Sequence, residues 1–131
     1  MIDPTGGAAT GGQSDLSNVW DGGVARPVLS KGVSNVVNNT TVTIIPAAPG
    51  LKTKVLGFHY MAITVTAAGS GVIWTGGGVL WVVSGPVVAN VPVVIPPAGV
   101  VIFSTPVNTA LGLNTDGNAN LISNVVYYQA P

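Results

Sequence analysis

Apolar and turn-forming residues alternate along most of the chain in short blocks. From Val33 onward, runs of Val, Ile and Thr are separated by Gly, Pro and Asn, and no segment repeats apolar residues at helical spacing. Short runs of this kind are typical of β-strands. We expect about eight strands, at residues 36–44, 54–66, 72–74, 79–83, 87–95, 100–104, 109–113 and 121–128. The pattern predicts an all-β fold, an antiparallel β-sandwich or jelly-roll-like domain with no helix longer than a turn.

The most apolar stretch, from Val82 to Phe103, is as apolar as a membrane span but contains Pro86, Pro92, Pro96 and Pro97. Each proline inside a helix removes a hydrogen-bond donor and costs roughly 3 kcal/mol. A spanning helix is therefore excluded, and the short strands lack the alternation of a membrane barrel. We expect no membrane partner, and Pro92 predicts that its strand lies at a sheet edge.

The longest expected strand is apolar on both of its faces. One face would carry Val55, His59, Met61, Ile63 and Val65, and the other Leu56, Phe58, Tyr60 and Ala62. A two-layer sandwich usually leaves one face of each sheet to water. We therefore expect a second subunit to cover part of this surface, which predicts a homo-oligomer. Tyr60 and Phe103 are the candidate interface residues on the strands.

Residues 1–32 differ from the rest of the chain and are expected to form an extended N-terminal arm, with the sandwich domain at 33–131. The arm holds seven glycines and three of the four carboxylates. Glycine-rich backbone is costly to order, so the arm needs anchors on a partner. Its candidate contact residues are Asp15, Trp20, Asp21, Val24, Arg26, Val28 and Leu29.

Charged residues are scarce in this chain, and this scarcity limits the classes of partner that it could bind. Charged residues make up 6% of the 131 residues, the formal net charge is zero, and none lies between Val55 and Thr115; soluble domains average roughly 25%. Nothing here favours nucleic acid or an anionic membrane as a partner. The chain lacks cysteine, which excludes disulfides and thiolate metal sites. Its first residues lack the basic and apolar regions of a secretory signal.

The candidate chemical groups all have simpler interpretations. His59 has no glutamate in the chain to pair with, so a structural or interface role is favoured over a general base. The stretch from Asn114 to Asn120 faintly resembles a calcium loop, but Asp116-Gly117-Asn118 fits a hairpin turn better. Trp74 and Trp81 favour core or interface packing over a sugar platform. We expect no catalytic residue, cofactor or metal.

Four segments together resemble a known group of proteins. They are Val42–Pro46, Lys52–Leu56, Ser104–Asn114 with its Ala-Leu-Gly-Leu-Asn ending, and Asn124–Tyr128. This succession, covering roughly residues 40–128, is similar to small virion-surface proteins of tailed bacteriophages.

The resemblance implies a capsid decoration, or cement, protein. Such a protein is a β-sandwich, often trimeric, that binds the outer surface of the phage head and clamps subunits of the major capsid protein. It would be made in the host cytoplasm and end on the virion, and it would not be an enzyme. The alternative is a domain of a phage tail fibre or spike that binds a receptor or a carbohydrate.

Overall fold

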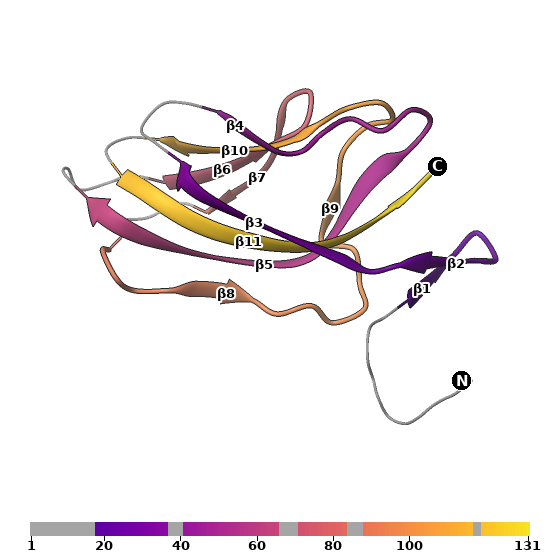
Figure 1. Cartoon of the computed structure of the whole chain (residues 1–131), viewed down its shortest axis with the longest axis horizontal. Coiled ribbons are helices and arrows are strands. Elements are labelled where there is room, and N and C mark those ends of the chain that lie inside the picture. Colours follow the sequence, from indigo (N-terminus) through magenta and orange to yellow (C-terminus); the bar gives the residue numbers. More distant parts are fainter. Residues whose placement is uncertain (1–17, 37–40, 66–70, 84–87, 117–118) are drawn as a thin grey trace.

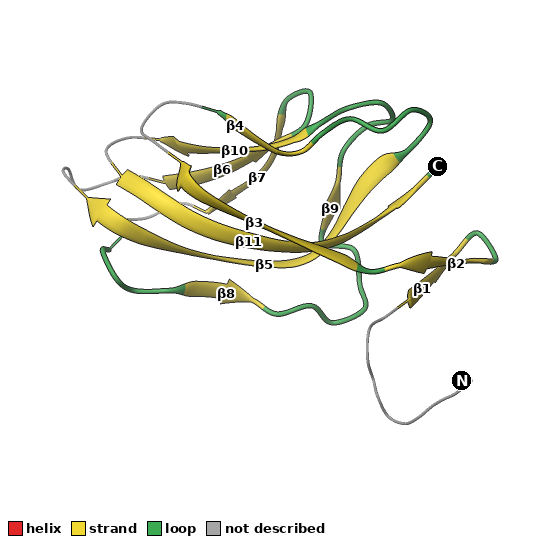
Figure 2. Cartoon of the chain, in the orientation of Figure 1, coloured by secondary structure: helices red, strands yellow, loops and turns green. Residues whose placement is uncertain are grey.

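The computed structural model describes residues 18–36, 41–65, 71–83, 88–116 and 119–131, and these contain strands and loops but no helix (Figures 1 and 2). Within these ranges, eleven strands form three antiparallel sheets. Their bounds are β1 Asn18–Asp21, β2 Val24–Pro27, β3 Leu29–Val36, β4 Val42–Ile45, β5 Lys52–Val65, β6 Gly71–Thr75, β7 Val79–Val83, β8 Val93–Ile95, β9 Phe103–Ser104, β10 Leu111–Asp116 and β11 Ala119–Ala130. The prediction of an all-β, sandwich-like domain is confirmed.

Two of the sheets lie against each other as layers and enclose the core (Figure 1). The first has the order β3-β11-β5-β8, with β9 also paired to β5; the second has the order β4-β10-β6-β7. Both sheets contribute buried side chains to one cluster: Ile44, Ile45, Val55, Phe58, Tyr60, Ala62, Val72, Trp74, Leu111, Leu113, Leu121 and Val125. Trp74 is fully buried, as the core interpretation predicted, and its ring centroid lies 4.9 Å from that of Phe58.

A β-bulge in β5 changes which residues share a face. Opposite β11, Val126 pairs with Gly57 but Tyr127 pairs with Val55, so Leu56 is an extra residue. A bulge of this kind reverses the alternation of side chains on one side of it. His59, Met61 and Ile63 share the outer face as predicted. Val55 instead lies in the main core, Val65 packs against it, and Leu56 faces outward into a second cluster.

Several expected strands differ in extent from the structure. The first is two strands, β3 and β4, in different sheets, and Thr40 between them lies outside the described residues. The fifth is reduced to β8, which does lie at the sheet edge beyond Pro92. The expected hairpin after Asp116 is wrong, because β10 and β11 belong to different sheets; residues 117–118 are not described.

The N-terminal arm ends earlier than expected. β3 begins at Leu29 and pairs with β11 from Tyr127 to Leu121, so residues 29–32 belong to the sheet. Before it, β1 and β2 form a two-stranded hairpin that lies at one end of the sandwich (Figure 1). The described part of the arm is therefore a folded hairpin and the start of a sheet strand.

Candidate functional site

The β1–β2 hairpin is the most distinctive surface element, and its sequence explains its shape. Asp21 pairs with Val24, leaving Gly22 and Gly23 as a two-residue turn with φ values of 61° and 77°. Two positive φ values define the type I′ turn, whose twist suits a hairpin and which favours glycine. The turn orients the two strands so that one hairpin face meets the sheet.

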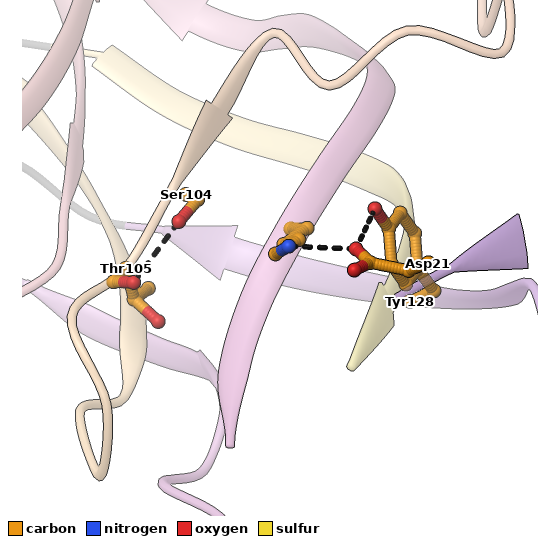
Figure 3. A network of polar contacts seen from close by, with 5 residues as sticks. Asp21, Ser104, Thr105 and Tyr128 are labelled. Carbon is orange, nitrogen blue, oxygen red and sulfur yellow. Dashed lines mark hydrogen bonds and ion pairs between the residues drawn. The ribbon is translucent and has the colours of Figure 1, made fainter. Parts of the chain in front are cut away.

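Asp21 ties this hairpin to the sandwich through one carboxylate oxygen (Figure 3). Lys54 Nζ on β5 donates to Asp21 Oδ2 at 2.6 Å, and the Tyr128 hydroxyl on β11 donates to the same oxygen at 2.6 Å. Lys54 Nζ also lies 5.8 Å from the centroid of the Tyr128 ring, within cation–π range. We call Asp21, Lys54 and Tyr128 the docking triad.

The docking triad shifts the ionisation of two of its members. Hydrogen bonds from Lys54 and then from Tyr128 hold the pKa of Asp21 below its ordinary value of 3.8. Burial, followed by the hydrogen bond to Asp21, raises the pKa of Tyr128 to about 12. Both shifts favour the state with a charged Asp21 and a neutral Tyr128, which is the state that the hydrogen bond requires.

Apolar packing beneath the triad supports the same contact. Leu56, Tyr128 and Ala130 are buried in a second cluster, and Val19, Val28 and Val126 pack against it. The bulge in β5 places Leu56 there. The outer face of the sheet is thus covered at this end by the chain's own hairpin, whereas a second subunit was expected to cover it.

The structure separates the residues predicted for partner contact into three groups. Trp20, Val24 and Leu29 are exposed, with Trp20 at 75%. Asp21 and Val28 make contacts within their own chain, Asp21 with Lys54 and Val28 with the second cluster. Arg26 is half-buried, and its Nε has no hydrogen-bond partner among the described residues. Asp15 lies outside the described residues.

Tyr60 and Phe103 are corrected from interface to core residues. Tyr60 is 4% exposed. The bulge at Leu56 reverses the alternation of side chains, so Phe58, Tyr60 and Ala62 point into the core together with Val55. Phe103 is half-buried between the rings of Trp74 and Trp81, with centroid distances of 5.9 and 5.8 Å. Tyr60 is thus enclosed in the core, and Phe103 is partly buried against it.

Sequence reasoning missed Lys54 and Tyr128 as the partners of Asp21. Asp21 is separated in sequence from Lys54 by 33 positions and from Tyr128 by 107 positions, so no local sequence pattern could predict these contacts. The hairpin itself left a signal, since Asp-Gly-Gly between two apolar pairs is typical of a type I′ turn. From that signal, residues on either side of Gly22-Gly23 could have been predicted to pair as two strands, with one face of the pair packed on the sheet.

A shallow groove of about 160 Å³ opens on the outer face of the five-stranded sheet. We call it the outer groove; its lining comprises Phe58, His59, Val94, Ile95, Pro96, Pro97, Asn124 and Val126. His59 and Asn124 are adjacent across β5 and β11 and are its polar side chains. His59 therefore faces outward from the sheet, beside an amide and without a described carboxylate in the groove.

Replacing Tyr128 with phenylalanine tests the docking triad. The variant keeps the ring in its cluster but removes the donor to Asp21, and should lower the free energy of unfolding by about 1 kcal/mol, a typical net value for one hydrogen bond. Because the pKa of Tyr128 is raised from 10.0 to about 12, its contribution is present below pH 10 and lost as pH rises toward 12. Urea unfolding should be measured at pH 8 and at pH 11. The wild type should lose more stability than the variant when the pH is raised from 8 to 11.

Tyr127→Phe is the matched control, because Tyr127 is half-buried on the same strand and makes no described hydrogen bond through its hydroxyl. Burial alone raises the pKa of Tyr127, so this variant shares the alkaline effect but not the hydrogen bond. Equal stability of the two variants at pH 8 would show that the hydrogen bond from Tyr128 to Asp21 contributes nothing to folding.

Within the described ranges, no three His, Asp or Glu side chains lie close enough to hold a metal ion. The same ranges contain no helix long and apolar enough to cross a membrane. No family model, curated protein or solved structure matches this chain.

Proposed function

We propose that this chain is a non-enzymatic structural protein of a phage virion, a decoration protein that binds the outer surface of the head and clamps neighbouring capsid subunits. The observation that carries the proposal is the outer face of the five-stranded sheet beyond the hairpin. Ile63, Val94 and Ile122 are 44%, 58% and 36% exposed there, on a stretch of β5, β8 and β11 that lacks formal charges. An exposed apolar surface of this kind favours permanent assembly with another protein.

The hairpin gives the same proposal a second contact surface. Trp20, Val24 and Leu29 are exposed at the end of the domain where the docking triad fixes the hairpin. Buried tryptophans carry much of the binding energy in protein interfaces, and a pre-ordered hairpin avoids the entropy cost of ordering a free arm. The proposal thus replaces a flexible arm with a rigid projection as the element that reaches a neighbour.

Copy number on the particle tests the proposal. Particles of the phage that encodes the chain would be purified, and the chain quantified against the major capsid protein by mass spectrometry with isotope-labelled peptides. A decoration protein should be present in many copies, in a fixed ratio to capsid subunits. A few copies per particle, or copies that separate with isolated tails, would instead support a tail fibre or spike.

A further inference from the structure

The outer groove has the size and chemistry of a site for one aromatic side chain. Its volume of about 160 Å³ compares with the roughly 150 Å³ of an engineered apolar cavity that takes up benzene. Gly57 brings the wall close: a Cβ there would lie 2.7 Å from the Ile95 carbonyl oxygen and 2.6 Å from the Pro97 nitrogen. The groove is thus built against backbone and rigid proline rings.

Trp20 is a large aromatic side chain that packs against little of its own chain. On β1, Val19 and Asp21 point toward the sheet, so alternation turns Trp20 away, where it is 75% exposed. Its neighbours on that hairpin face are Asn18, Ala25 and Pro27, none of them charged. The type I′ turn and the docking triad hold this face in a fixed position, so little freedom remains to be lost on binding.

We infer that Trp20 of one chain inserts into the outer groove of a second copy, so that the chains associate head to tail. Neither surface carries a formal charge, so the contact would bury no unpaired ion. His59 and Asn124 offer acceptors for the indole Nε1–H, which needs a partner when buried. Trp20 does not fill the groove of its own chain, because its side chain is mostly in solvent.

The surrounding surface supplies the additional area that such an interface needs. One tryptophan buries about 150–250 Å², whereas a stable interface takes roughly 800 Å² from each partner. Exposed Ile63 and Ile122 lie on the same outer sheet face as the groove. Beside Trp20 on its hairpin face lie Asn18, Ala25 and Pro27. Val126 lines the groove and also packs against the cluster beneath the hairpin, so the groove begins next to the covered end of the sheet.

An interface of this kind is heterologous, because each chain offers a different surface to each neighbour. Repetition produces a closed ring if the rotation closes, and a filament if it does not. The inference deepens the proposed function by naming a second copy as the partner of the hairpin. It rests on the proposed function only for the expectation that the exposed apolar surfaces are buried by another polypeptide.

Sedimentation velocity of the full chain, alone and in the absence of phage heads, tests this inference with two variants and a control. Trp20→Ala removes the inserted side chain, and Val94→Lys places a charge in the wall of the groove, on an edge strand where charges are tolerated. Val79→Lys, at a 65% exposed position on edge strand β7 of the other sheet, is the control. Circular dichroism spectra of all three should match the wild type.

At tens of micromolar the wild type and Val79→Lys should sediment as oligomers. Each test variant should be monomeric, with association weakened roughly 30-fold or more, as for an interface hot spot. An equimolar mixture of the two test variants should form a heterodimer and nothing larger, since one intact Trp20 then meets one intact groove.

A monomeric wild type, unchanged association of Trp20→Ala, or a mixture that stays monomeric would each overturn the inference. Unchanged association of Trp20→Ala would leave residues 1–17 or another partner as the occupant of the groove. None of these results alters copy number on the particle, so failure here is separate from failure of the proposed function.

Discussion

Replacing Trp74 with alanine should lower the free energy of unfolding by about 3–5 kcal/mol, the usual cost of removing a large aromatic side chain from a core. Trp74 is fully buried between the two sheets and packs against Phe58 and Phe103 at centroid distances of 4.9 and 5.9 Å. Its removal leaves a cavity that strands of both sheets would have to close. Because domains are stable by only about 5–15 kcal/mol, the variant should be close to unfolding at 25 °C.

Trp81→Ala is the appropriate comparison, because Trp81 pairs with Trp74 on the neighbouring edge strand but is 36% exposed. It should lose clearly less stability, since water already reaches part of its ring. Urea unfolding followed by circular dichroism at one protein concentration would measure both. Equal losses would mean that Trp74 is not the centre of the core.

Gly57→Ala should destabilise the chain by about 1–3 kcal/mol, as expected for overpacking. The added methyl group would lie 2.6 Å from the Pro97 nitrogen and 3.0 Å from the Pro96 carbonyl carbon. These are backbone atoms, so no flexible side chain can move aside, and the segment that follows β8 must shift. The substitution should also disturb the outer groove, because Pro96 and Pro97 form part of its wall.

Gly32→Ala provides a matched control on the same sheet. A Cβ at Gly32 would have its nearest contacts at 3.5 Å, to Asn124, and 3.8 Å, to the Ser123 carbonyl oxygen. These are ordinary van der Waals distances, so stability should stay equal or rise by about 0.4–1 kcal/mol through the less flexible unfolded chain. If thermal unfolding showed the same effect for both variants, the close approach at Gly57 would be refuted.

The fold class was predictable because Val/Ile-rich runs and turn residues report local preferences. The last strand shows this well: alternation placed Val125 and Tyr127 opposite Val126 and Tyr128, and the structure sends the first pair to the main core and the second to the outer cluster. Alternation failed where the backbone departs from regular pairing. The bulge at Leu56 is visible only once β11 is placed beside β5.

The candidate site was less predictable, because it depends on contacts between distant segments. The sequence pointed to Trp20 and Asp21 as contact residues, but not to the partners of Asp21, which lie on β5 and β11. Tyr60 looked like an interface residue because a strand that is apolar on both faces does not show which face is enclosed. Sheet order and packing decide that question, and single-strand periodicity does not contain them.

An electron cryomicroscopy map of the particle that carries this chain would test the proposed decoration role most directly. We expect the domain on the outer surface of the head. The uncharged outer face around Ile63, Val94 and Ile122 should be buried against a neighbouring polypeptide, and Trp20 should be enclosed as well. A domain located on the tail, or one on the head with this face and Trp20 both in solvent, would contradict it.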